Sequence, residues 1–276
     1  WYLTKKIYLN EGKTVQQLDT LFVYTAVATL VGARLGDCFF YNWDYFKDHL
    51  LEIFLPIKEK AGGGWQLTGF SGLASHGAAV GIIIAMLLYV RKYKDIKLSW
   101  ILDRVVIPIT IGGMFVRFGN FFNSEINGKI VSDQYPLGVK FVQDGMLSPQ
   151  RAMALTEQTD AQEAYKLITH DPRYAEVLAS IPYQHPAQLY EAFGYFCLFW
   201  VLWYVYWKTD KKEQSYFIFG LFLVLLWSIR FAVEFVKESQ GGFESTLGLL
   251  STGQWLSIPF IIVGLYLLFR KKVSKL

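Results

Sequence analysis

Cysteine is scarce in this 276-residue chain, and its scarcity excludes several kinds of protein. The two cysteines, Cys38 and Cys197, both lie inside apolar runs. Cysteines of this kind behave as small hydrophobic side chains, so we expect neither a disulfide nor a thiolate metal site. The chain also lacks an HxxH pattern and a cluster of cysteine and histidine, which argues against zinc. We therefore expect no metal ion and no cofactor.

Charge is also sparse, whereas apolar residues are abundant. Charged residues make up 18% of the chain, and a net charge of +4 gives no reason to expect nucleic-acid binding. Hydrophobic residues account for 53% and aromatic residues for 17%. A helix that crosses a bilayer core of about 30 Å needs about 20 apolar residues, and the chain has several runs of that kind. The composition predicts an all-α, polytopic transmembrane helical bundle embedded in membrane lipids.

Six segments are candidate spans, and one long polar segment interrupts them. The spans cover about 18–41, 74–90, 100–121, 188–207, 215–236 and 253–269. Residues 125–187 are polar and contain short helical patterns, so we expect a small extramembrane insertion within a single transmembrane domain, 1–276.

Basic residues give the bundle an orientation. With six spans, four clusters fall on one side, and the excess of lysine and arginine in short loops makes that side cytoplasmic, together with the carboxyl terminus. The clusters are Lys5, Lys6 and Lys13; Arg91, Lys92, Lys94 and Lys97; Lys208, Lys211 and Lys212; and Arg270, Lys271, Lys272 and Lys275.

This orientation brings polar groups from five spans toward the outer face at one depth. Because polar groups at that depth are costly unless they are paired or hydrated, we expect them to converge on one site. They are Arg34, His76, Arg117–Glu125, His185–Glu191 and Arg230–Glu234.

The stretch from Arg117 to Gly128, RFGNFFNSEING, is the hardest to explain as packing. Arg117 and Asn120 are three residues apart, as are Asn120 and Asn123, so in a helix they share a face. A guanidinium and two amides are donors suited to phosphate oxygens, and Gly119 allows a ligand to approach the backbone closely. The alternative is that these groups only tie helices together.

Two residues from the first two spans allow two interpretations each. Arg34 is either a contact to a lipid headgroup or an arginine that reaches the outer interface or pairs with Asp37. His76 is either a general base or a residue that caps the start of its helix.

Later motifs complete the candidate site. Gln188 and Glu191 are three residues apart at the start of the fourth span, and a carboxylate there needs a partner, which Arg117 or Arg230 could supply. Arg230 and Glu234 are four residues apart; they form either an intrahelical salt bridge or a part of the shared site in which Glu234 orients Arg230.

Together these motifs resemble the prolipoprotein diacylglyceryl transferase family of bacterial inner membranes. The resemblance rests on RFGNFFNSEING at Arg117–Gly128, on HPAQLYE at His185–Glu191, on the pattern Arg230-x-x-x-Glu234-Phe235, on His76-Gly77 and on Gly32-x-Arg34-x-Gly36. It covers essentially the whole chain. The family has seven spans with the amino terminus outside, so Trp1–Lys13 is expected to be the tail of a further, first helix.

The resemblance implies transfer of a diacylglyceryl group from phosphatidylglycerol to the lipobox cysteine in the signal peptide of a prolipoprotein, with release of glycerol phosphate. It implies an active site toward the periplasmic leaflet. The expected catalytic residues are Arg117, Arg230, Glu125, His76, Glu191 and Glu234. The expected substrate-binding residues are Arg34, Asn120, Asn123, Gly119, His185, Gln188 and Tyr190.

Two other classes of function compete. A transporter or flippase for an anionic lipid would also need arginines and broken helices, but it predicts inverted repeats and polar sites near mid-membrane. The sequence shows no repeat, and its polar groups gather toward one leaflet. A membrane scaffold without catalysis would leave the buried charge unexplained.

Overall fold

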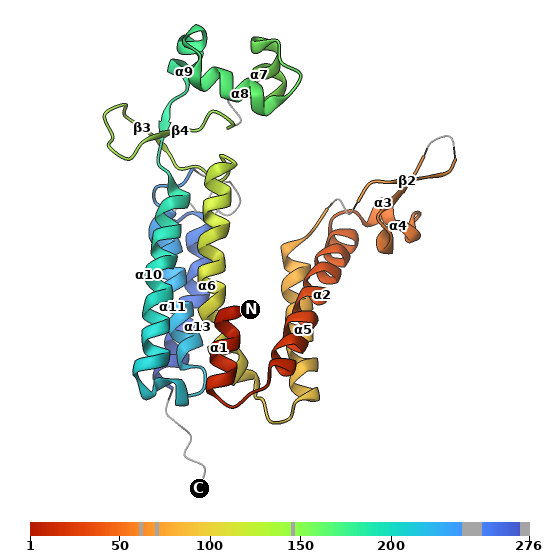
Figure 1. Cartoon of the computed structure of the whole chain (residues 1–276), viewed down its shortest axis with the longest axis vertical. Coiled ribbons are helices and arrows are strands. Elements are labelled where there is room, and N and C mark those ends of the chain that lie inside the picture. The colour runs from red at the N-terminus through yellow and green to blue at the C-terminus, as the bar shows by residue number, and fades with distance from the viewer. Residues whose placement is uncertain (61–62, 70–71, 145–146, 239–249, 271–276) are drawn as a thin grey trace. The chain divides into compact units, whose positions relative to one another are not determined.

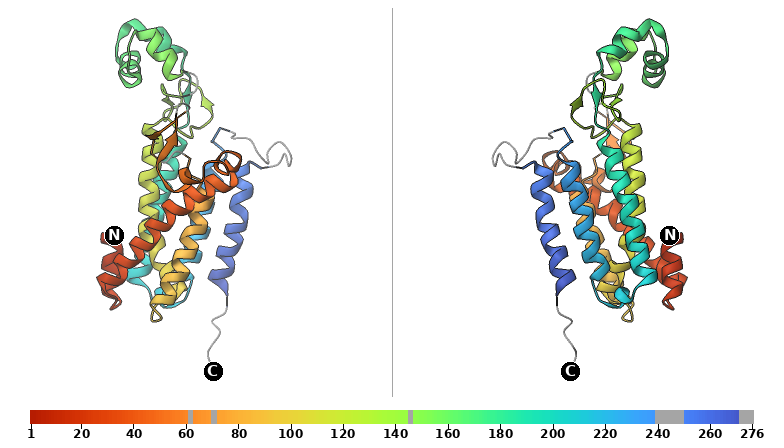
Figure 2. Two further views of the ribbon diagram at one scale, coloured as in Figure 1. Left: turned by 90° about the vertical axis from the view of Figure 1, so that its right-hand side faces the viewer. Right: turned by 90° about the vertical axis from the view of Figure 1, so that its left-hand side faces the viewer.

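A computed structural model describes residues 1–60, 63–69, 72–144, 147–238 and 250–270. Lys271, Lys272 and Lys275, which the sequence places in a cytoplasmic cluster, lie outside the described residues. The chain divides into two compact units, unit 1 (Trp1–Leu102) and unit 2 (Asp103–Leu276), and each is described by itself. Figures 1 and 2 show the elements of both.

Long apolar helices lie where the sequence suggested candidate spans. Among the described residues, five helices are long and apolar enough to cross a membrane: α2 (Val15–Phe40), α5 (Ser75–Lys92), α6 (Leu98–Phe122), α10 (Ala187–Lys208) and α13 (Thr252–Phe269). The sixth prediction, 215–236, corresponds to α11 (Phe217–Val233), which is apolar but has 17 residues. It is shorter than predicted because Tyr216 takes a left-handed φ of 64° before it and Glu234 follows it in a turn. The predicted polytopic helical membrane protein is confirmed.

Unit 1 is built on α2 and α5, which pack along each other. Thr14 and Gln17 start α2 with a capping box, because each side chain bonds the backbone N–H of the other residue at 3.1 and 2.9 Å. The connection between the two helices contains α3 (Trp43–Phe46), α4 (Leu50–Phe54) and a hairpin of β1 (Ile57–Glu59) and β2 (Trp65–Leu67). The hairpin is antiparallel, with Ile57 opposite Leu67.

Glycines allow α2 and α5 to approach each other at backbone distance. A Cβ atom on Gly77 would lie 2.7 Å from the Cα of Gly36, and closer still to the carbonyl oxygen of Gly32. Small residues at a helix interface permit such contact in membranes, where packing rather than hydrophobic exclusion holds helices together.

We therefore predict that Gly77→Val separates α2 from α5. Overpacking of this kind costs about 1–3 kcal/mol, so the thermal unfolding midpoint in detergent should fall clearly. Gly112→Ala is the matched control, because within the described part of unit 2 nothing lies within 4 Å of a Cβ at that helical glycine. An unchanged midpoint for Gly77→Val would contradict the close approach.

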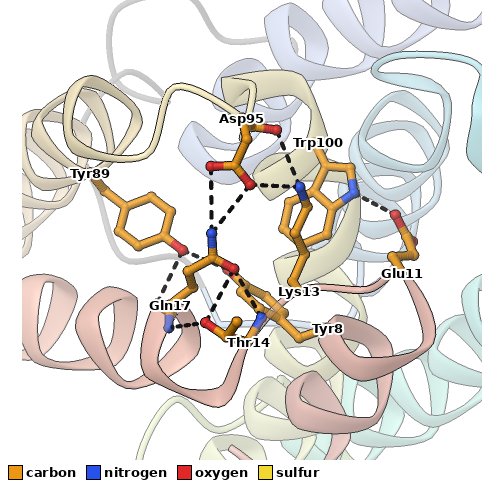
Figure 3. Close-up of polar contacts among 8 residues, drawn as sticks. All are labelled: Tyr8, Glu11, Lys13, Thr14, Gln17, Tyr89, Asp95 and Trp100. Carbon is orange, nitrogen blue, oxygen red and sulfur yellow. Dashed lines mark hydrogen bonds and ion pairs between the residues drawn. The ribbon is translucent and has the colours of Figure 1, made fainter.

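A polar cluster fastens α1 (Tyr2–Asn10) to the rest of unit 1 (Figure 3). Lys13 forms an ion pair with Asp95 at 2.9 Å, and Gln17 donates to the same carboxylate at 3.2 Å. Trp100 donates its indole N–H to Glu11. The ring of Tyr8 packs edge-on against Trp100. The segment before α2 is thus tied to the connection between α5 and α6.

Unit 2 contains α10, α11 and α13, which pack in that order, with α6 beside them (Figure 1). Buried Asp103 begins the α6 portion of this unit and accepts the backbone N–H groups of Tyr216 and Phe219 at 2.7 and 2.8 Å. These are donors that the first turn of α11 cannot satisfy internally. Arg104 donates to the carbonyl of Lys212 in the 3₁₀ helix η2 (Asp210–Glu213) at 3.1 Å.

The polar segment after α6 folds into a small sheet and several short helices. The sequence predicted short helices there but no sheet. Its central strand β5 (Tyr183–Gln184) pairs antiparallel with both β3 (Ile130–Val131) and β4 (Val139–Lys140). The helices α7 (Pro149–Thr156), α8 (Ala161–His170) and α9 (Ala175–Ser180), with the 3₁₀ helix η1 (Pro172–Tyr174), surround a small apolar core. That core contains Leu147, Ala152, Ala164, Tyr165, Ile168 and Ile181.

Candidate active site

The end of α6 carries the first part of the site. Arg117 donates from Nη1 to the amide oxygen of Asn120 at 3.3 Å, and Asn120 donates to the carboxylate of Glu125 at 2.7 Å. The amide of Asn123 reaches the same carboxylate at 3.5 Å. The guanidinium, the two amides and the carboxylate are therefore linked by hydrogen bonds that meet at Glu125. Arg117 and Asn120 lie on α6, whereas Asn123 follows its last residue, Phe122.

The backbone after α6 turns sharply through two residues in left-handed conformation. Ser124 has a φ of 55° and Ile126 a φ of 58°. For a β-branched residue such as Ile126 this conformation is a genuine outlier, of the kind that costs about 1–3 kcal/mol and persists only where neighbours hold it. Here Asn127 donates to the carbonyl of Ser124 at 3.1 Å, and Gln188 donates to the carbonyl of Glu125 at 2.6 Å.

Glu191 on α10 is fully buried and lies at the centre of the charged groups. Its Oε2 lies 2.6 Å from Nε of Arg117, without the alignment of a hydrogen bond. Its Oε1 accepts a hydrogen bond from the Nζ of Lys237 at 2.8 Å. Lys237 also lies 3.7 Å from Glu234. A buried carboxylate of this kind needs counter-charges, and two cations supply them directly.

Arg230 on α11 joins the same group. It interacts electrostatically with Tyr195, Glu191 and Glu234, and its guanidinium lies 5.3 Å from the centre of the Trp227 ring. Arg117 contacts Glu191 directly, whereas Arg230, from a helix far along the chain, lies near enough to feel the charge of the same carboxylate. Glu234 lies in the turn after α11 rather than inside the helix, and its ion pair at 3.7 Å is with Lys237.

The chain after α11 is joined by backbone contacts to the end of the stretch from Arg117 to Gly128. Gly128 forms an antiparallel bridge with Lys237, and its N–H donates to the carbonyl of His185 at 2.9 Å. A Cβ atom on Gly128 would lie 2.5 Å from the Cβ of His185, so a larger residue does not fit there. The bridge holds Lys237 where its side chain reaches Glu191.

His185 and Tyr190 lie together at the start of α10. Nδ1 of His185 is 3.2 Å from the hydroxyl of Tyr190, which is 3.4 Å from the hydroxyl of Tyr135. The rings of Tyr135 and His185 pack edge to face at 4.7 Å. Tyr135 comes from the β3–β4 connection, which the sequence did not single out.

Arg34 and His76 belong to unit 1 and are described with it alone. Arg34 is buried and donates to two carbonyl groups of α4, that of Glu52 at 2.6 Å and that of Ile53 at 3.3 Å. The Nδ1 of exposed His76 lies 3.4 Å from the hydroxyl of Tyr41. Arg34 therefore holds the connection after α2 in place, whether or not it also meets a headgroup.

The carboxylate of Glu52 shows how firmly that connection is held. Burial raises the pKa of this group, but the N–H of Glu59 at 2.8 Å and the hydroxyl of Tyr45 at 2.7 Å outweigh it, so the pKa lies below its usual value. Hydrogen bonds to the charged form thus stabilise the segment that Arg34 binds.

Unit 2 therefore brings together a set of predicted residues from α6, α10, α11 and the turns that follow α6 and α11: Arg117, Asn120, Asn123, Glu125, Gln188, Glu191, Arg230 and Glu234. Gly119 lies on the same turn of α6 as Asn120, with nothing in the described part of unit 2 within 4 Å of a Cβ placed there. Convergence of this set with Arg34 and His76 stays a prediction. Among the described residues, no group of three acidic, histidine or cysteine side chains is placed to hold a metal ion.

Sequence reasoning missed Lys237, Asn127 and Tyr195. Lys237 directly follows the fifth predicted span and was not assigned to the site, but it is 6% exposed and contacts two carboxylates. Its position three residues after Glu234 was the available signal. Asn127 is also buried, although it lies inside the stretch from Arg117 to Gly128 that the sequence analysis singled out.

Comparisons with known proteins agree with the motifs. The sequence model of a family described as prolipoprotein diacylglyceryl transferase matches residues 1–270. A phosphatidylglycerol–prolipoprotein diacylglyceryl transferase of Bacteroides fragilis is 39% identical over 271 residues, which cover 97% of this chain and 84% of the relative. The protein of the same name from Tolumonas auensis is 35% identical over 275 residues, covering 100% and 87%, and that from Porphyromonas gingivalis is 32% identical over 274, covering 98% and 82%. As its motifs predicted, the chain belongs to the prolipoprotein diacylglyceryl transferase family.

Proposed function

We propose that this protein transfers the diacylglyceryl group of phosphatidylglycerol to the lipobox cysteine of a prolipoprotein, the first step of lipoprotein maturation. The cysteine thiol loses its proton, and the sulfur attacks the glyceryl carbon that carries the phosphate. A carbon–sulfur bond forms, the bond from that carbon to the phosphate oxygen breaks, and glycerol phosphate leaves with the bonding electrons.

The observation that carries the proposal is the group of cations around Glu191. Arg117 and Lys237 contact this buried carboxylate at 2.6 and 2.8 Å. Arg230 lies near it, and Glu234 lies 3.7 Å from Lys237. Cations held in place by buried acids suit an anionic phosphate. The phosphate gains negative charge as it leaves, so cations already held in place stabilise the transition state more than the ground state.

The remaining residues have roles in the same reaction. Asn120 and Asn123 orient the oxygens of the glycerol and the phosphate, and Glu125, Glu191 and Glu234 position the arginines. A free thiol has a pKa of about 8.5, so a base or a cationic field must promote the thiolate. Glu125 and His76 are the candidate bases in this proposal.

We further propose the cellular setting that the charge pattern supports. The protein lies in the bacterial inner membrane, its carboxyl terminus faces the cytoplasm, and the site opens toward the periplasmic leaflet. Residues 125–187 then form a periplasmic insertion beside the site, and the partners are phosphatidylglycerol and the signal peptide of the prolipoprotein.

Purified protein, phosphatidylglycerol and a lipobox peptide provide the test. The proposal expects a peptide whose mass has increased by one diacylglyceryl group, joined through a thioether that survives base treatment. A peptide with serine in place of the cysteine should stay unmodified. Movement of lipid between the leaflets of vesicles without any covalent product would instead support the flippase and reject the transferase.

A further inference from the structure

Gln188 on α10 has one polar atom that the fold leaves without a partner. The residue is 1% exposed, and its amide oxygen, Oε1, has no hydrogen-bond donor among the described residues. A buried acceptor without a donor costs free energy comparable to a lost hydrogen bond, so native structures seldom keep one without a use.

The orientation of the amide is fixed by its neighbours. The amide nitrogen, Nε2, lies 2.6 Å from the backbone carbonyl of Glu125 and 2.7 Å from the side-chain oxygen of Asn127. Because a backbone carbonyl only accepts hydrogen bonds, the nitrogen must face it. Both amide protons are therefore committed to the strained turn, and Oε1 is the atom left to meet something else.

Gln188 also lies beside the charges assigned to the phosphate. It precedes Glu191 by three residues, so the two side chains are neighbours on one face of α10. Glu191 in turn contacts Arg117 at 2.6 Å. A phosphate held by Arg117 would therefore lie beside Glu191, one helical turn from Gln188.

The chemistry of phosphatidylglycerol supplies one kind of strong donor next to its phosphate. The ester groups on the diacylglyceryl side only accept hydrogen bonds, whereas the headgroup glycerol has two hydroxyl groups. The cysteine thiol is a weak donor and has to lose its proton.

Resting on the function proposed above, we propose that Oε1 of Gln188 accepts a hydrogen bond from a hydroxyl group of the phosphatidylglycerol headgroup. Gln188 is then the residue that selects a glycerol headgroup, while its Nε2 holds the turn that carries Glu125. One side chain thus both holds the turn after α6 and selects the lipid headgroup.

A substrate lacking both headgroup hydroxyls tests this directly. Phosphatidylpropanol keeps the phosphate and the three-carbon headgroup, and the wild-type protein should use it about 10- to 100-fold less efficiently, as kcat/KM, because Oε1 stays unpaired. In Gln188→Leu this discrimination should shrink to about threefold or less. The two analogues that each lack one hydroxyl then identify the hydroxyl that is bound.

Asn127→Ala is the matched control. It removes an acceptor of Nε2 but keeps Oε1, so it should slow both lipids equally and preserve the ratio. A wild type that uses both lipids equally well overturns the inference, and so does a Gln188→Leu variant that keeps the discrimination. Either result, with thioether formed from phosphatidylglycerol, leaves the proposed function standing; failure of the wild type to form any thioether rejects that function instead.

A binding measurement tests the same inference if Gln188→Leu proves inactive. Glycerol phosphate should raise the thermal unfolding midpoint of the wild type more than propyl phosphate does, because only the former has hydroxyl groups. In Gln188→Leu the two ligands should give equal shifts. Equal shifts in the wild type would mean that Oε1 meets water or the protein alone, and would overturn the inference.

Discussion

Replacing Glu191 by glutamine is expected to reduce diacylglyceryl transfer by a factor of about a hundred to several thousand. The change keeps the shape of the side chain but removes the charge that Arg117 and Lys237 contact at 2.6 and 2.8 Å. Breaking a buried ion pair by removing one partner costs about 3–5 kcal/mol of folding stability, because the other charge stays buried without compensation. Losing one well-placed group that stabilises developing charge slows the chemical step by about 100- to 1,000-fold, and here two cations are affected. We expect the two cations to move away from the phosphate position.

Rates of thioether formation, with the unfolding midpoint measured alongside, check this result. Glu163→Gln on α8 is the matched control, because Glu163 is exposed and its ion pair with Lys166, at 3.9 Å, is a surface pair of small energetic value. The control should retain near-normal transfer. Glu191→Gln with near-normal transfer would show that Glu191 does not position the cations.

Replacing Arg117 by lysine is expected to have the second-largest effect, a loss of about 100- to 1,000-fold in kcat. Lysine keeps the positive charge and can still approach Glu191, but it lacks the planar fork that lets Arg117 contact both Glu191 and Asn120. Removing one well-placed donor to a developing negative charge typically has an effect of about this size.

The split between kcat and KM is the informative measurement for Arg117→Lys. A fall in kcat with little change in KM means that the fork acts mainly in the transition state, whereas a rise in KM alone means that it only binds the lipid. Arg151→Lys, an exposed substitution on α7, controls for the chemistry of the change. Normal lipidation by Arg117→Lys would contradict a role that depends on guanidinium geometry.

Much of the fold could be predicted because a membrane imposes simple rules on sequence. Apolar runs of about 20 residues marked the helices. The strands could not be found in this way: β3, β4 and β5 have two residues each, too few to show alternation, and they pair only because the polar segment folds back on itself. The backbone contact of Gly36 with Gly77 likewise depends on how two helices meet.

The candidate site likewise has a part that could be predicted from the sequence and a part that could not. Helical spacing placed Arg117 with Asn120, and Gln188 with Glu191, because residues three apart share a face. It could not place Lys237 against Glu191, 46 residues earlier in the chain, because that contact depends on the bridge between Gly128 and Lys237. Nor could it show that Ile126 takes a left-handed conformation, which depends on the amide of Gln188 reaching the carbonyl of Glu125.

The central claim is that Glu191 acts through Arg117 to place positive charge at the leaving phosphate. A double-mutant cycle with Arg117→Lys, Glu191→Gln and the double variant, measured as kcat/KM for thioether formation, tests it most directly. We expect the double variant to be hardly slower than the worse single variant, because either change alone already displaces the guanidinium. Losses that multiply in full would show that the two residues act independently, and would contradict this account.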